Sequence, residues 1–316
     1  MMRSLYSGIS GLKNHQTRMD VIGNNIANVN TVGYKASRTI FQDIFSQTVK
    51  SGTANMGYIG GTNPTQIGLG IKLATVDVLH TPAPIARTDN PFDMMIEGDG
   101  FFILQDENMN YYYTRAGDFY LDDQGYLVSS HGYYVMGYTY ELSWEDEIPA
   151  VYTTEGNLVP GTGIPGYVLV DDSGAGLSTD LQRIRLKFEG TDGGGIAVEA
   201  DLVGFSVGQD GSVSVIINNI KETIGYLGVS MFSNAGGLEK AGNSLYRESP
   251  ASGSALLTMA LMDGSGRVLG GGLEMSNVDL ATEFTDMIVT QRGFQANSRV
   301  ITVSDTLLEE LVNLKR

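Results

Sequence analysis

The chain of 316 residues contains no cysteine. Disulfide bonds, thiol nucleophiles and zinc–thiolate sites are therefore excluded. The compartment stays open, because both cytosolic and secreted proteins can lack cysteine. Proline is also scarce, with 8 residues, whereas glycine is abundant, with 41. Abundant glycine with little proline predicts many tight turns between short strands rather than a proline-rich linker.

Long apolar runs and excess positive charge are missing as well. No stretch reaches the roughly 18 apolar residues that a membrane helix needs, so we expect no membrane insertion. Residues 1–10 lack the basic segment and apolar core of a secretory signal, so export is expected to leave the N-terminus uncleaved. The net charge is −16, which argues against nucleic-acid binding. The acidic excess lies in residues 78–276, while residues 1–35 hold four basic side chains and one acidic.

Motifs for catalysis are not found either. The three histidines, His15, His80 and His131, share no metal-binding or catalytic spacing. Neither a GxSxG elbow nor a GxxxxGK[ST] phosphate loop is present. Gly98-Asp99-Gly100 and the other Asp-Gly clusters predict turns, since the twelve-residue calcium loop is absent. We therefore expect no enzyme activity, no cofactor and no metal site.

Residues 4–30 show the apolar spacing of an amphipathic helix. The glycines at positions 8, 11 and 23 each cost up to about 1 kcal/mol against alanine, so the helix should form only when packed. Gly33 is expected to stop it. The apolar residues recur at spacings of three, four and seven, and we assign them to an assembly interface: Leu5, Ile9, Leu12, Met19, Ile22, Ile26 and Val29.

Residues 277–314 predict a longer helix, with Ser276 and Asp279 as a capping box at its start. Its apolar residues repeat every seven positions, which is typical of a coiled-coil seam. The apolar row is Leu280, Met287, Phe294, Ile301 and Leu308. The row between them is mixed and supplies polar markers of register: Phe284, Gln291, Ser298, Asp305 and Val312.

A second apolar stripe follows the same helix through Val300, Val303, Leu307, Leu311 and Leu314. Two apolar faces on one helix of an acidic chain need two partners. The N-terminal helix can supply one, and a neighbouring subunit the other. The sequence therefore predicts self-assembly, with Leu280, Phe284, Met287, Phe294, Ile301, Leu308, Leu311 and Val312 as its interface on this helix.

Short strands are predicted between the two helices. A first set covers 92–97, 101–105, 111–114, 118–121, 126–129 and 133–138, and a second covers 184–188, 196–207, 212–217, 226–232 and 255–262. The fold class is therefore α+β, with long N- and C-terminal helices paired as a coiled coil and mainly antiparallel β-domains, barrel- or sandwich-like, inserted between them. The expected domains are 1–35 with 277–316 as the helical assembly domain, 36–77 as an extended connector that opens with a helical turn at 40–49, 78–140 with 201–276 as a β-rich domain, and 141–200 as a small inserted outer β-domain.

Several long motifs resemble those of the bacterial flagellar rod and hook proteins. They occur in the family's order over roughly 1–138 and 203–316, but not over 141–200. The motifs are Ser4-Leu5-Tyr6-Ser7-Gly8-Ile9-Ser10-Gly11-Leu12, Gly23-Asn24-Asn25-Ile26-Ala27-Asn28 through Lys35, Gly98-Asp99-Gly100-Phe101-Phe102, Tyr113-Thr114-Arg115-Ala116-Gly117-Asp118-Phe119, Gly242-Asn243-Ser244-Leu245-Tyr246, Glu274-Met275-Ser276-Asn277-Val278-Asp279-Leu280 and Thr290-Gln291-Arg292-Gly293-Phe294-Gln295-Ala296-Asn297.

The resemblance implies a tubular homopolymer in the extracellular bacterial flagellum, in its hook or basal body. The terminal helices would line a channel and the β-domains would form the wall. Implied partners are other copies of the chain, the distal rod, hook cap and hook–filament junction proteins, and the flagellar export apparatus. Phe41 and Phe45 resemble the paired-Phe export signal of such substrates, although a buried helical contact between residues four apart would give the same spacing.

Within the family, Gly293-Phe294-Gln295 and the insert 141–200 favour the hook, a flexible joint that transmits torque from motor to filament. The long connector 51–70 instead resembles rod proteins, so the distal rod is the alternative. An alternative of another class is a secreted β-rich carbohydrate-binding module or glycosidase. Its sugar platform would be the tyrosine cluster Tyr111, Tyr112, Tyr113, Tyr133 and Tyr134.

Overall fold

The computed structural model describes residues 2–54, 60–139, 181–186, 189–191, 197–199, 204–217 and 220–314. The chain divides into two compact units. The helical unit consists of Met1–Asn30, Lys35–Thr81 and Asn277–Arg316, and the β unit consists of Thr31–Tyr34 and Pro82–Ser276. Most of the insert predicted at 141–200 lies outside the described residues. The α+β class, with two terminal helices and mainly antiparallel sheets, is confirmed.

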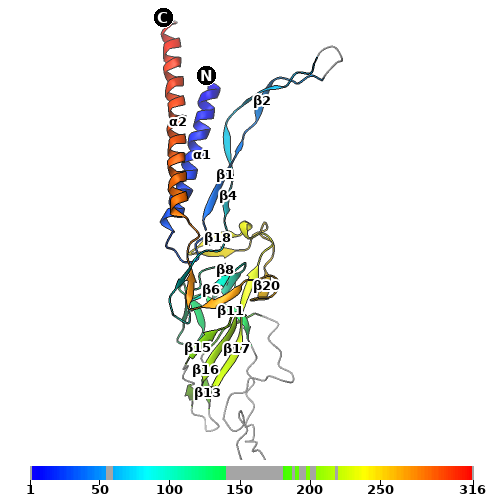
Figure 1. The fold of residues 1–316 in the computed structure, drawn as a ribbon, viewed down its shortest axis with the longest axis vertical. Coiled ribbons are helices and arrows are strands. Elements are labelled where there is room, and N and C mark those ends of the chain that lie inside the picture. Colours follow the sequence, from blue (N-terminus) through cyan, green and yellow to red (C-terminus); the bar gives the residue numbers. More distant parts are fainter. Residues whose placement is uncertain are drawn as a thin grey trace, which may run out of the picture. The chain divides into compact units, whose positions relative to one another are not determined.

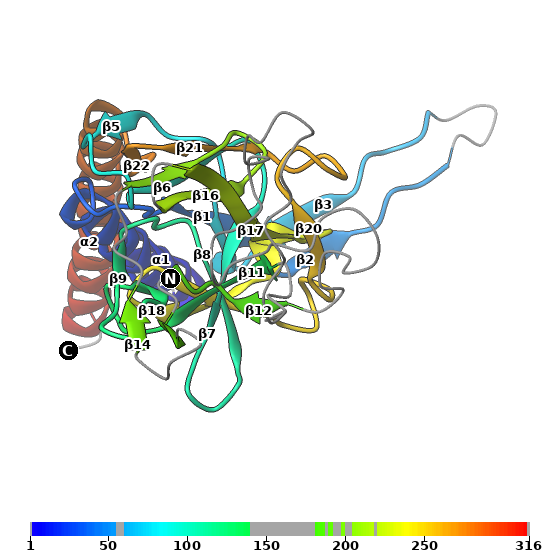
Figure 2. The ribbon, with the colours of Figure 1, turned by 90° about the horizontal axis from the view of Figure 1, so that it is seen from below.

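Two long helices form the core of the helical unit. They are α1 (Met2–Ala27) and α2 (Leu280–Asn313), which lie side by side in Figures 1 and 2. Both predicted helices are therefore confirmed, but the predicted cap at Ser276 is wrong. Asp279 caps α2 instead, because its carboxylate accepts from Ala281 N at 3.0 Å and from the Thr282 hydroxyl at 2.7 Å. None of the described helices is long and apolar enough to cross a membrane.

A long β-hairpin completes the helical unit. Its strands are β1 (Ser37–Asp43), β2 (Ser46–Lys50), β3 (Thr65–Gly68) and β4 (Ile71–Val78), with β1 paired to β4 and β2 to β3. The helical opening predicted at 40–49 is thus wrong. Ile, Phe, Thr and Val dominate that stretch and favour extended backbone. The hairpin is attached to α1 by Asn14 Nδ2, which donates to Ile71 O at 2.8 Å.

The β unit is built from short antiparallel strands. These are β5 (Ile85–Arg87), β6 (Met94–Glu97), β7 (Phe101–Gln105), β8 (Tyr111–Thr114), β9 (Phe119–Leu121), β10 (Leu127–Ser129), β11 (Tyr134–Thr139), β12 (Gln182–Arg183), β13 (Glu189–Thr191), β14 (Ala197–Glu199), β15 (Gly204–Val207), β16 (Ser212–Ile217), β17 (Ile220–Met231), β18 (Glu239–Gly242), β19 (Leu245–Arg247), β20 (Leu256–Met259), β21 (Arg267–Gly270) and β22 (Gly272–Glu274). The main sheet follows the order β15-β16-β17-β11-β7-β8-β19-β18.

The strands of the β unit enclose a common hydrophobic core. Phe102 and Leu104 of β7 are fully buried, and the Phe102 ring meets Phe119 edge-on at 5.2 Å. Ile184 and Leu186 belong to the same buried cluster, and the preceding strand β12 pairs with β11. Residues 181–186, which the sequence assigned to the inserted domain, are therefore part of the main β core.

Candidate assembly surface

Small and polar side chains take part in the contact between α1 and α2. The helices are antiparallel, since Ser4 Oγ lies 3.5 Å from Ser304 Oγ near one end and Asn25 Nδ2 donates to Glu283 Oε1 at 2.9 Å near the other. A Cβ added at Gly11 would lie only 2.5 Å from Asn297 Nδ2. The glycine that weakens α1 as an isolated helix thus permits the close approach of the two backbones.

One of the two predicted seam rows is displaced by one residue, whereas Ile301 of the apolar row packs against Gly8 of α1. The buried residues of α2 are Thr290 and Ser304, in a row with Glu283 and Asn297. The mixed row predicted at 284, 291, 298, 305 and 312 lies one position further on and is exposed, apart from the half-buried Ser298. The cause is the composition of α1, which presents glycine, serine and asparagine where α2 touches it. That surface admits small polar residues of α2 together with Ile301, which packs against Gly8.

Apolar residues predicted for assembly flank this seam. On α1, Ile22 is buried and Ile9 is exposed, while Leu5, Leu12, Met19, Ile26 and Val29 are half-buried. On α2, Met287, Ile301 and Leu308 are half-buried, whereas Leu280, Phe284, Phe294, Leu311 and Val312 are exposed. The helix pair therefore leaves much of its apolar surface uncovered within one chain.

One uncovered surface is the second apolar stripe, which we call the outer stripe: Val300, Val303, Leu307, Leu311 and Leu314. Its side chains are between 43% and 82% exposed. The C-terminal end of α2 extends beyond the start of α1 (Figure 1). An apolar surface of this length on a charged helix is typical of an interface.

His15 lies where α1, α2 and β1 meet. Its ring packs against Gly293, where an added Cβ would be 2.8 Å away, and meets Phe41 edge-on at 6.3 Å. Its Nδ1 is buried and has no hydrogen-bond partner among the described residues. Burial lowers the pKa of His15, and the nearby Arg18 lowers it further.

We therefore predict that mild acid destabilises the helical unit through His15. With the folded-state pKa below the unfolded value of about 6.5, neutral His15 contributes fully above that pH, and stability falls as the pH drops toward the folded-state pKa. Urea unfolding followed by helical circular dichroism at about pH 7.5 and about pH 5.5 measures the loss. His15→Gln should remove that part of the pH dependence, and an unchanged dependence would contradict the assignment. Burial raises the pKa of Glu283, so this residue changes stability with pH in the direction opposite to His15. The His15→Gln variant retains that contribution.

A second cluster ties residues 31–34 into the β unit. Gly33 N donates to Glu274 O at 2.8 Å, and Ala83 N donates to Glu274 Oε1 at 3.2 Å. Gly33 has φ +66°, and an added Cβ would lie 2.5 Å from Ala116 N, so only glycine fits there. The Glu274 side chain faces Arg115, with Oε2 3.6 Å from Nη1, and both side chains are at most 2% exposed.

Arg115 and Glu274 were not predicted as a pair, since 159 positions separate them in the sequence. Arg115 also donates to Ile96 O at 3.2 Å, and its guanidinium carbon lies 5.2 Å from the centre of the Phe101 ring. Burial lowers the pKa of Arg115, while Glu274 opposes that shift. Arg115 lies between the predicted strands 111–114 and 118–121, beside turn residues, so the local sequence carries no signal for a buried ion pair.

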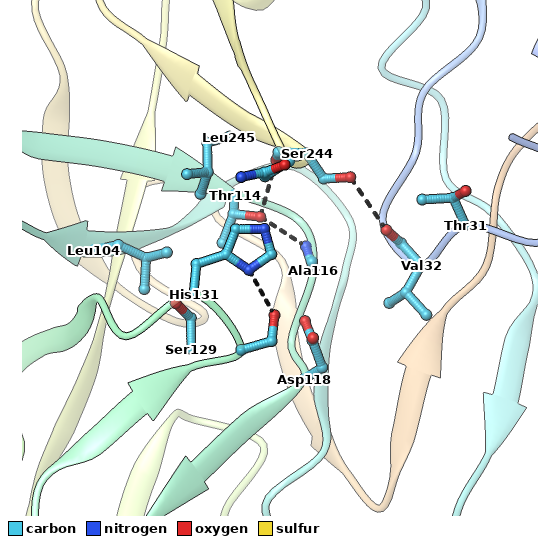
Figure 3. A pocket seen from close by; sticks show the side chains of 12 residues that line it. Thr31, Val32, Leu104, Thr114, Ala116, Asp118, Ser129, His131, Ser244 and Leu245 are labelled. Carbon is cyan, nitrogen blue, oxygen red and sulfur yellow. Dashed lines mark hydrogen bonds between the residues drawn. The ribbon is translucent and has the colours of Figure 1, made fainter. Parts of the chain in front are cut away.

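A cleft of about 320 Å³ opens beside this cluster (Figure 3). The Thr114 hydroxyl donates to Ser244 O at 3.0 Å, and the Ser244 hydroxyl donates to Val32 O at 3.5 Å. Ser130 Oγ is 2.9 Å from His131 Nδ1. The polar groups of the cleft thus bond largely to one another and hold three sequence motifs together. Among the described residues, no group of three His, Asp or Glu is placed to hold a metal ion.

Three family models match the chain. They are the flagellar hook protein FlgE/F/G D1 domain over residues 95–215, the flagellar basal body rod FlgEFG protein C-terminal model over 269–314 and the flagella basal body rod protein model over 5–35. The flagellar basal-body rod protein FlgG of Bacillus subtilis is 44% identical over 318 positions, covering all of both chains. The chain belongs to the flagellar rod and hook protein family.

Hook proteins of the same family are also similar to the chain. The flagellar hook protein FlgE of Borreliella burgdorferi is 32% identical over 443 positions, and that of Treponema pallidum is 30% identical over 464, each with full coverage of both chains. As a member of this family, the chain is a structural subunit of the flagellar axis.

The carbohydrate-binding alternative finds no support among these relatives. Of the tyrosines proposed as a sugar platform, Tyr111 is exposed and the others are buried or half-buried. Tyr112 stacks on Tyr133 at 5.4 Å, and Tyr113 is buried, with its hydroxyl donating to Glu248 at 2.6 Å. They are largely core and sheet residues of a flagellar β-domain.

Proposed function

We propose that this chain is a rod subunit of the flagellar basal body, the alternative named from its sequence, rather than the hook subunit. The extent of the alignments carries the proposal. The chain of 316 residues aligns with FlgG over 318 positions, so nearly every residue of the rod protein has a counterpart in this chain. The hook alignments need 443 and 464 positions, because both hook proteins contain long stretches without a counterpart here.

The hairpin of the helical unit supports the same choice. The long connector around 51–70 resembles rod proteins, and the strands β2 and β3 at its two ends are paired. Asn14 and Ser10 both contact its β4 end, with Ile71 N donating to Ser10 Oγ at 3.4 Å. A hairpin that is hydrogen-bonded to α1 favours a stiff tube over one that bends.

In the assembled rod, α1 and α2 would pair as a coiled coil and line the channel, and the β units would form the wall. The outer stripe and the flanking apolar rows would be buried between copies. The partners are other copies of the chain, neighbouring rod and hook components, and the export apparatus. Phe45 is 85% exposed and Phe41 lies in strand β1, so the two are available as an export signal rather than buried as a helical pair. No catalytic step is part of this function.

Straight tubes are the expected result when purified protein is concentrated and viewed by negative-stain electron microscopy. Curved or polymorphic tubes would favour the hook instead. A protein that stays monomeric at high concentration, with protease-resistant terminal helices, would count against any polymer role. Because α1 and α2 expose so much apolar surface, the rod proposal predicts protease-sensitive ends in the monomer and protected ends in the tube.

A further inference from the structure

The β unit carries an exposed apolar patch that its own fold leaves uncovered. Strand β20 pairs with β17 and, among the described residues, with no other strand. Leu256 and Leu257 on this strand are exposed, as are Leu261 and Met262 in the turn that follows it. We call these four residues the β20 patch.

Leu261 is held in this position against its backbone preference. Its φ is +63°, a left-handed conformation that is a marked outlier for a bulky residue, and its side chain is 59% exposed. Such strain costs on the order of 1–3 kcal/mol and persists where the surroundings enforce it, often at functional positions. The chain therefore presents a leucine to solvent at a cost in backbone energy.

The turn that carries Leu261 is well bonded. Ser265 Oγ donates to Met259 O at 2.7 Å, and Leu261 N donates to Gly266 O at 3.2 Å. The Thr258 hydroxyl donates to Asp263 Oδ2 at 3.3 Å, which places an exposed carboxylate beside the apolar side chains. The patch is thus a preorganised surface with an acidic edge.

A complementary surface exists on the β2–β3 part of the hairpin. Phe45, Val49 and Ile67 are exposed there, and a two-stranded ribbon is only marginally stable in water without a further surface. Lys50 is the sole charged residue in 44–70, whereas residues 78–276 carry the acidic excess of the chain. Apolar side chains beside one positive charge fit the apolar, acid-edged β20 patch.

We propose that the β20 patch of one copy receives the β2–β3 ribbon of a second copy, with Lys50 of the second copy beside Asp263 of the first. The proposal rests on the polymer function argued above. In this arrangement the strained Leu261 lies in an interface between copies. The exposed two-stranded ribbon gains the packing surface that it lacks within one chain.

The first test replaces Leu261 with asparagine, which tolerates the left-handed backbone and removes the apolar surface. The monomer should melt at the same temperature as the parent or higher. The concentration needed for tube formation should rise about ten-fold or more, the loss expected for one buried leucine. The matched control is Met109→Asn, because Met109 is also exposed (73%) and left-handed (φ +61°) but lies in the turn between β7 and β8. It should polymerise normally.

The second test identifies the segment that binds the β20 patch. Since the chain has no cysteine, Leu261→Cys and Val49→Cys introduce the only thiols. Tubes grown from an equal mixture of the two variants should give heterodimers with a short bismaleimide, and Met109→Cys mixed with Val49→Cys should not. Two results would overturn this inference and leave the proposed function standing. One is normal tube formation by Leu261→Asn, and the other is cross-linking between two Leu261→Cys chains in place of the heterodimer. Absence of tubes from the parent protein would overturn the proposed function and, with it, this inference.

Discussion

Val303→Asp combined with Leu307→Asp will abolish tube formation and leave the isolated chain folded. Both side chains lie on the exposed outer stripe, so carboxylates there cost the monomer little. In a tube the same carboxylates would be buried between copies without partners, at a cost of several kcal/mol each. We expect the concentration needed for assembly to rise by more than about 100-fold. Sedimentation and electron microscopy measure assembly, and circular dichroism measures the fold.

The matched control for this variant is Thr302→Asp with Thr306→Asp. It adds the same charges at the same helical spacing on an exposed face whose hydroxyls bond only to their own helix, to Arg299 O and Val303 O. This control should assemble far better than the stripe variant. Equal assembly of the stripe variant and the parent would show that the outer stripe is not an interface. Equal loss in both variants would show that charge alone blocks assembly.

Ile301→Asp should behave differently from the stripe variant. A Cβ at Gly8 would lie 3.3 Å from Ile301 Cγ1, so Ile301 packs against α1 within the same chain. The seven-residue repeat assigns Ile301 to the assembly interface. Its position beside Gly8 implies that helical content falls along with assembly.

The periodicity of apolar residues predicted both helices and most strands of the β unit. The bounds of β7, β8 and β16 match the predicted runs, since each is a short apolar segment between turn residues. The same reasoning was wrong at 40–49, where Ile40, Phe41, Ile44 and Phe45 satisfy a helical spacing as well as an extended one. Only pairing with β4, more than 25 residues later, decides between the two.

The seam and the buried ion pair could not be predicted for a related reason. A seven-residue apolar repeat identifies an assembly face but does not say which second row faces the partner helix, and here glycine and serine on α1 admit the small polar row beside Ile301. Arg115 and Glu274 meet only because the antiparallel sheets bring their segments together. Local sequence patterns carry no information on that pairing.

The buried pair leads to the second large effect. Glu274→Gln should destabilise the β unit by about 3–5 kcal/mol, because it leaves the Arg115 charge buried without its counter-charge. Glutamine keeps the oxygen that accepts from Ala83 N, so the loss reports on charge rather than on that hydrogen bond. Urea unfolding followed by the β-sheet signal measures the change. The exposed pair of Glu97 and Arg267 at 2.7 Å is the matched control, and Glu97→Gln should change stability little.

Removing the charges of both Arg115 and Glu274 shows whether this pair stabilises the β unit through electrostatics or through packing. Arg115→Met alone should cost about as much as Glu274→Gln, since each leaves one buried charge behind. The double variant should recover most of the loss, because methionine fills the space beside Phe101 and no charge remains uncompensated. Additive losses in the double variant would mean that the two residues act independently. In that case the attachment of residues 31–34 would depend on Gly33 and the backbone of Glu274 rather than on the ion pair.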